Sequence, residues 1–189
     1  MKPTFENLVG TKGGTIHVTI SPPRNAGSGL TAARESIVLG GGGGALTLGD
    51  GTGNDSGMWV QYMAGRGCYG IAAGGETWAA SGPFSGCHIV VGKKDGSIYV
   101  AHLAQQSGST ADADWAGRGW KDDPWGRWKV PIPSQTIAFT SSIVFVDWSK
   151  GANPSSVSVV RMDVQHRAMG GFDSTPMTIL DVAHIVNPG

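Results

Sequence analysis

The stretch CHIVVGKKDGSIYVAHLA, residues 87–104, decides the fold of this chain. Its two halves are rich in β-branched and aromatic residues, and the Asp95-Gly96 dipeptide between them is a strong signal for a two-residue hairpin turn. We therefore predict two antiparallel strands joined by a tight turn. The predicted register has three informative pairs: Lys94 with Ser97, Ile89 with His102, and Cys87 with Ala104.

The alternation of side chains along each strand then assigns the polar residues of this hairpin to its two faces. Directly opposed residues share a face, and faces alternate along a strand, so Cys87 and His102 are predicted to be diagonal neighbours on one face. Diagonal positions lie roughly 7–8 Å apart at the backbone, within reach of a sulfur and an imidazole. His88 should point to the opposite face as a half-exposed or hydrogen-bonded histidine. A register slip of one residue would reverse these assignments.

Size and composition favour one mainly β domain over residues 1–189. The chain has 31 glycines and lacks long runs of helix-forming residues, which is typical of strands joined by glycine-rich turns. Further strands are expected at 15–21, 33–39, 58–63, 143–148, 156–164 and 177–186, with a turn of helix as the alternative at 33–39. We expect an α+β fold that is mainly β, a β-sandwich flanked by one or two short helices.

Charge and hydropathy exclude several classes of partner. The 14 basic and 14 acidic residues cancel, so no broad basic field is expected to hold nucleic acid. No run approaches the roughly 20 apolar residues of a membrane span, and the N-terminus has no apolar segment typical of a secretory signal. We expect a monomer that binds neither nucleic acid nor a bilayer.

Two glycine-rich segments resemble ligand loops without meeting their requirements. Residues 40–44 are five consecutive glycines, but the Gly-Lys-Ser/Thr ending of a phosphate-binding loop is missing, so a flexible or tightly turning loop is expected. Residues 49–57 mix aspartate, asparagine and glycine but lack the closing glutamate of a helix-loop-helix calcium site, so a plain turn is expected.

A tryptophan-rich segment follows the hairpin. Four tryptophans lie within fourteen residues, among arginines and aspartates: Trp115, Trp120, Trp125 and Trp128. Tryptophan and arginine are typical of binding hot spots, so the four are candidates for substrate binding. The alternative is that they cap one edge of the sheet core.

The segment Phe84-Ser85-Gly86-Cys87, with His102 downstream, resembles the toxin deamidases of the cytotoxic necrotizing factor and Burkholderia lethal factor group. Their hallmark is Leu-Ser-Gly-Cys followed by a histidine, and phenylalanine replaces the leucine here. In the lethal-factor-like members a threonine six positions before the cysteine orients the histidine, and Ser81 is the matching residue. The specific resemblance covers residues 77–104.

This resemblance implies a toxin-deamidase-like β-sandwich with Cys87, His102 and Ser81 at one end. It implies a secreted or delivered bacterial toxin or effector, without a cleaved signal, that converts a glutamine of a host protein to glutamate. The targets of the group are Rho-type GTPases in one branch and a translation-initiation RNA helicase in another.

The chemistry follows from the residue types. Cys87 would be the nucleophile, His102 the base and Ser81 the group that fixes the imidazole tautomer. Backbone N–H groups of Ser85, Gly86 and Cys87 would stabilise the developing oxyanion. An imidazolium beside the thiol would lower the pKa of the cysteine, and neither metal nor organic cofactor is required.

Other interpretations share these residues. Cys87 and His102 could be a buried thiol and a hydrogen-bonded core histidine. The same pair could serve a cysteine protease or a transglutaminase. A non-enzymatic β-sandwich could bind carbohydrate through its tryptophans. Cys68 is expected to be a buried free thiol, the alternative being a disulfide with Cys87.

Overall fold

The computed structural model describes residues 1–20, 29–133, 137–166, 172 and 175–187. Its strands are β1 (Thr15–Thr19), β2 (Thr31–Ala32), β3 (Arg34–Gly42), β4 (Ala45–Asp50), β5 (Gly57–Val60), β6 (Gly67–Ile71), β7 (Trp78–Phe84), β8 (His88–Lys94), β9 (Ser97–Leu103), β10 (Asp123–Lys129), β11 (Thr140–Asp147), β12 (Ser158–Gln165) and β13 (Met177–Val186). The helices are α1 (Phe5–Val9), α2 (Ala111–Ala116) and the 3-10 turn η1 (Pro154–Ser156).

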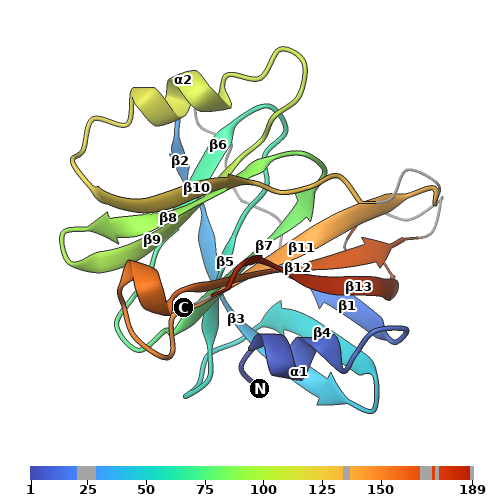
Figure 1. The fold of residues 1–189 in the computed structure, drawn as a ribbon. Coiled ribbons are helices and arrows are strands. Elements are labelled where there is room, and N and C mark those ends of the chain that lie inside the picture. Colours follow the sequence, from blue (N-terminus) through green and yellow to red (C-terminus); the bar gives the residue numbers. More distant parts are fainter. Residues whose placement is uncertain (21–28, 134–136, 167–171, 173–174, 188–189) are drawn as a thin grey trace.

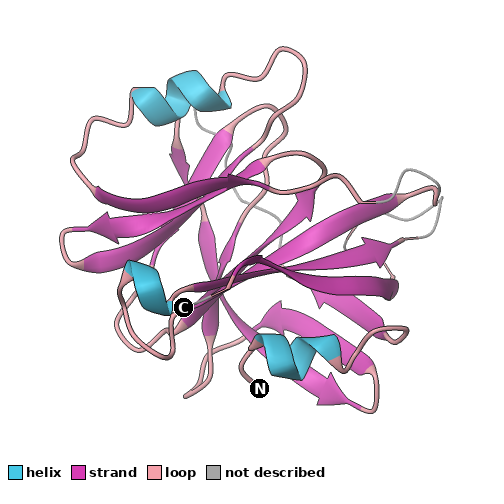
Figure 2. Cartoon of the chain, in the orientation of Figure 1, coloured by secondary structure: helices cyan, strands magenta, loops and turns pink. Residues whose placement is uncertain are grey.

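The strands form a closed barrel and a second sheet (Figures 1 and 2). The barrel has the order β1-β13-β12-β11-β7-β5-β3-β4, and the parallel pairing of β1 with β4 closes it. The second sheet has the order β10-β8-β9-β6-β2, so β9 is its central strand. The prediction of a mainly β chain with few short helices is confirmed. The prediction of a two-sheet sandwich is corrected, because one of the two layers curls and closes on itself.

Alternation along the strands divides the core into three layers. In β11, Ile143 and Phe145 point into the barrel, whereas Val144 and Val146 point toward the second sheet. The layer between barrel and sheet also holds both cysteines. Helix α2 lies over the other face of the second sheet (Figure 1). A smaller apolar cluster packs on this face. The second sheet is therefore buried on both faces, with one face against the barrel wall.

Eight of the thirteen described strands were predicted from the sequence, including β8 and β9 of the hairpin, and five were missed. Residues 177–186 form β13 as predicted, and the ends of β1, β3, β5, β11 and β12 lie within three residues of the expected ones. The missed strands include β6, β7 and β10. The last of these runs through the tryptophan-rich segment. Residues 49–57 join the end of β4 to the start of β5. The described residues contain no cluster of three or more histidine, cysteine or acidic side chains suited to a metal.

The glycine run is partly strand. The first three of its glycines extend β3, and only Gly43 and Gly44, both with positive φ, make the turn into β4. The expectation of a loop over all five is corrected. Within the strand, Gly41 has φ +104°, and a Cβ placed there would lie 2.1 Å from the Ala45 carbonyl oxygen.

Gly41→Ala is expected to lower the free energy of unfolding by about 2 kcal/mol or more, because the new methyl group meets backbone that cannot move aside. Gly40→Ala is the matched control, since nothing lies within 4 Å of its Cβ position and its φ is not in the left-handed region. Urea unfolding of both variants checks this. Equal stability of the two would contradict the described turn.

No helix in the described part of the chain has the length and apolar character needed to cross a bilayer.

Candidate active site

The hairpin that carries the candidate site has the predicted register. Lys94 pairs with Ser97 and Ile89 with His102 in the β8–β9 ladder. Asp95 and Gly96 both have positive φ, 50° and 82°, as the mirror-image hairpin turn requires. The local signals of turn and alternation were therefore sufficient to align these two strands.

Cys87 and His102 lie on the same side of the second sheet. Cys87, like Ile89, belongs to the layer between barrel and sheet, and the His102 ring stacks on Phe84 of that same layer. Residues of opposite parity, such as Leu103, face α2 instead. The expected shared face is confirmed.

His88 lies on the other face, as parity predicts. Its Nδ1 is 3.1 Å from an Arg127 nitrogen, and Arg127 is paired with Asp112 of α2. Partial burial, followed by the charge of Arg127, lowers the pKa of His88. This histidine has no access to the thiol.

Cys87 sits on the loop that crosses from the barrel to the second sheet. β7 belongs to the barrel and β8 to the sheet, and residues 85–87 connect them. Gly86 takes φ +85°, a conformation that glycine adopts without strain. The Val130 N–H donates to the Cys87 carbonyl at 2.9 Å, which anchors the loop at the end of β10.

Two residues of this loop, Gly86 and Cys87, are buried and have N–H groups without a backbone acceptor. In the part of the chain that the structure describes, neither Gly86 nor Cys87 donates a backbone hydrogen bond. Ser85 is exposed at the outer end of the loop, while Cys87 is 7% exposed. Two N–H donors without backbone acceptors, next to a thiol, are the kind of groups from which an oxyanion hole is built, and that role for this motif stays a prediction.

The His102 imidazole is enclosed by aromatic rings. It stacks on Phe84 with ring centroids 3.8 Å apart and planes 6° apart, and Tyr62 lies 5.2 Å away. Burial, and secondarily the proximity of Cys87, raises the pKa of the Tyr62 hydroxyl. Tyr62 thus lies close to both members of the pair. Tyr62 could not be singled out from sequence, because it lies after the end of β5, outside the described strands.

Ser81 determines which nitrogen of His102 carries the proton. The Ser81 hydroxyl lies 2.7 Å from the Val60 carbonyl oxygen and 2.8 Å from His102 Nδ1. A hydroxyl has one proton, and the carbonyl can only accept it, so Ser81 must accept the second bond from Nδ1–H. The proton is on Nδ1, and Nε2 carries a lone pair. Nε2 is buried and, among the described residues, has no hydrogen-bond partner.

Burial also sets the charge of His102. The residue is 1% exposed, and desolvation lowers the pKa of its imidazole to about 3. The ring is therefore neutral at physiological pH. This differs from the imidazolium expected beside the thiol, because the aromatic enclosure offers no carboxylate to stabilise a positive charge.

Cys68 is the neighbour of His102 that sequence analysis did not foresee. It lies on β6 directly opposite His102 on β9, whereas on the other side His102 pairs with Ile89 and Cys87 lies two residues before Ile89. Cys68 is fully buried, and desolvation, with a smaller effect of Asp114, raises the pKa of its thiol to about 12. Both cysteines are free. Cys68 is thus an inert thiol, as expected, and the disulfide alternative is not observed.

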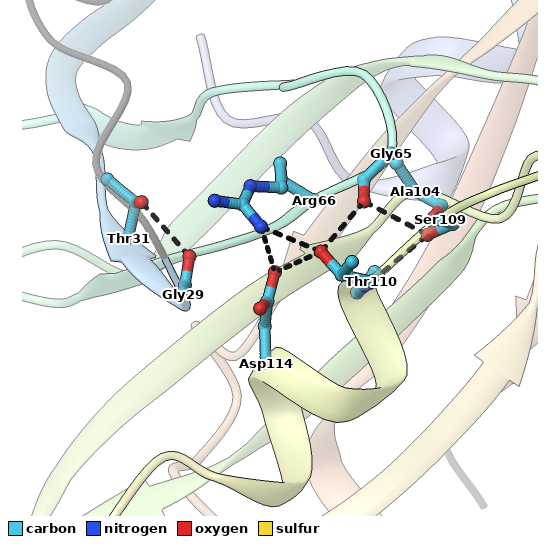
Figure 3. Close-up of polar contacts among 9 residues, drawn as sticks. Gly29, Thr31, Gly65, Arg66, Ala104, Ser109, Thr110 and Asp114 are labelled. Atoms are coloured by element: carbon cyan, nitrogen blue, oxygen red, sulfur yellow. Dashed lines mark hydrogen bonds and ion pairs between the residues drawn. The ribbon is translucent and has the colours of Figure 1, made fainter.

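A polar network holds the end of β9 just beyond His102. The Ser109 hydroxyl contacts the carbonyls of Gly65 and Ala104 (Figure 3). Arg66 lies 2.8 Å from the Thr110 hydroxyl and 3.7 Å from Asp114 of α2. These contacts join β6, β9 and α2, so they hold the C-terminal end of β9, the strand that carries His102.

The structure divides the four tryptophans between two faces of the second sheet. Trp115 and Trp120 pack edge to face under α2, with the Arg118 guanidinium 4.5 Å from the Trp115 ring. Trp125 and Trp128, on β10, pack against the layer that holds Cys87. All four are half-buried, so they do not form one stacking surface. Only the β10 pair shares a side with the candidate nucleophile.

No protein-family model matches this chain, and no curated protein matches it significantly.

Proposed function

We propose that this protein is a hydrolase of side-chain carboxamides that uses Cys87 as nucleophile and His102 as base, acting as a protein glutamine deamidase. The observation that carries the proposal is the orientation of His102. Its Nδ1–H donates to Ser81, and its Nε2 has no hydrogen-bond partner among the described residues, Cys87 included, although the ring and Cys87 lie on the same side of the second sheet. Most buried ring nitrogens have a hydrogen-bond partner, so an unpaired, unprotonated Nε2 at this position supports a role as proton acceptor.

The reaction would proceed through a thioester. Nε2 takes the thiol proton as Sγ attacks the carboxamide carbon, and the Gly86 and Cys87 N–H groups receive the oxyanion. His102 then passes the proton to the departing ammonia, and water hydrolyses the thioester with the histidine as base. Because burial disfavours the imidazolium, proton transfer and attack should be closely coupled.

The finer assignment rests on the resemblance in residues 77–104. It comprises a toxin-deamidase-like catalytic domain, in a secreted or delivered bacterial effector, with a host protein as substrate. A Rho-type GTPase or a translation-initiation RNA helicase is the proposed target. Incubating the chain with these candidates tests the proposal, with ammonia release and the intact mass of the target as readouts. A cleaved target or an incorporated amine would instead assign a protease or a transglutaminase.

Ser81→Ala is expected to lower turnover about a hundredfold, because the imidazole loses the acceptor that fixes its tautomer. Ser81→Thr keeps the hydroxyl and should retain most of the activity. Nitrogen NMR of the His102 ring gives a second readout, since Nδ1 should be the protonated nitrogen in wild type and Ser81→Thr, and a mixture of tautomers should appear in Ser81→Ala. An unchanged tautomer and unchanged turnover in Ser81→Ala would refute this positioning role.

A further inference from the structure

A second candidate site lies at the end of the barrel that α1 covers. A cavity of about 100 Å³ opens there, lined by residues of α1, of the loop after β11 and of three barrel strands. Side chains of β11, β12 and β13 that point into the barrel are apolar along most of its length: Ile143, Phe145, Val160, Met162, Ile179 and Val182. At this end the same inward positions are polar.

Strand register brings three polar side chains into this cavity. Asp147 pairs with Ser158 across β11 and β12, and His184 pairs with Val160 across β12 and β13. Each has the parity of the inward-facing core residues next to it. The three therefore converge from adjacent strands. Phe5 of α1 stacks on the His184 ring at 4.0 Å and forms an aromatic wall.

The polar atoms of this cavity are incompletely paired within the described chain. Ser158 is 7% exposed, and its hydroxyl oxygen has no hydrogen-bond partner there. His184 Nδ1 is likewise buried without a partner. Asp147 is 6% exposed and accepts one bond, from the Ser149 N–H at 2.9 Å, but the described residues offer it no ion pair. Leaving such groups unpaired is costly, so a ligand that pairs them gains free energy.

The charges around the cavity indicate the class of ligand. Asp147 and Glu6 contribute two carboxylates and Lys150 one ammonium, so the lining favours a cation. The cavity has room for only a few heavy atoms. A carboxylate, a hydroxyl and an imidazole nitrogen match the three N–H donors of a primary ammonium group. An aromatic ring beside them adds a favourable contact for a cation.

We propose that this barrel-end cavity binds a small primary amine in its ammonium form, through Asp147, Ser158 and His184. This site is independent of the Cys87–His102 pair, which lies on the outer side of the barrel wall.

Titration of the full chain with methylammonium chloride, at constant ionic strength, tests the proposal. Saturable NMR shifts are expected at the Ser158 amide and the His184 ring, and sodium acetate should produce none. Asp147→Asn and Ser158→Ala should each weaken binding about tenfold, since each removes one charge-assisted bond. Asp95→Asn, on the exposed hairpin turn, is the matched control and should bind like wild type. Thermal unfolding verifies that each variant is folded.

Three outcomes would overturn the proposal. The first is the absence of saturable shifts, which would mean that water alone fills the cavity. The second is equal binding by wild type, Asp147→Asn and Ser158→Ala. The third is binding that appears only after Lys150→Met, which would show that the Lys150 ammonium occupies the site itself.

Discussion

Cys87→Ala abolishes ammonia release, a loss of about a thousandfold or more, whereas Cys68→Ala keeps activity close to wild type: this is the largest effect that we expect. The two thiols flank His102 on the same face, so the pair of substitutions separates a nucleophile from a structural cysteine. Cys87 lies on a loop with free N–H donors, while Cys68 lies in the middle of the sheet, fully buried. The raised pKa of Cys68, about 12, leaves almost no thiolate at neutral pH.

Alkylation provides the control for this comparison. In folded wild type at pH 8, iodoacetamide should modify Cys87 well before Cys68, and both should react after unfolding in urea. Mass spectrometry of the digested protein locates the label. An active Cys87→Ala variant, or a Cys68→Ala variant that is inactive though folded, would show that the roles of the thiols are wrongly assigned.

The second large effect concerns stability and pH. The pKa of His102 is about 3 in the folded protein, below the ordinary value of about 6.5 for an unfolded chain. Between these values the unfolded state binds one more proton, so stability is lost as the pH falls and does not depend on this group above about pH 7. The titration of His102 therefore lowers the free energy of unfolding by about 2 kcal/mol between pH 7 and pH 5.

Comparison with His102→Asn isolates this contribution. Asparagine places an amide near the position of Nδ1 and does not titrate, and the other histidines are common to both proteins. The free energy of unfolding of wild type should therefore fall by about 2 kcal/mol more than that of the variant from pH 7 to pH 5. Urea unfolding at several pH values measures it. Parallel pH profiles would mean that His102 is not held neutral in the folded state.

What could be predicted from the sequence was local. The Asp95-Gly96 turn and strict alternation set the β8–β9 register, and with it the face shared by Cys87 and His102. Barrel closure was out of reach, because parallel pairs such as β1 with β4 bring together segments that no short-range signal connects. Cys68 and Tyr62 were missed for the same reason. Their proximity to His102 depends on how β6 and the end of β5 meet the hairpin, which is tertiary packing.

Strand β10, in the tryptophan-rich segment, was difficult to predict from the sequence for a different reason. Its glycine, proline and charged residues hide the alternation of β10, and the ladder between β10 and β8 has a register shift between Pro124 and Gly126. Pattern analysis reads such a segment as a loop, although half of its tryptophans are bound into a sheet.

The crossing of residues 85–87 from barrel to sheet has a mechanical consequence. Ser81 belongs to the barrel and His102, the proposed base, to the second sheet, and the proposed nucleophile Cys87 lies on the loop between them. Any shear of one layer against the other changes all three relationships at once. A partner that binds only the outer surface of one layer would therefore change the rate of the proposed reaction by altering the alignment of the two layers, without contacting the thiol.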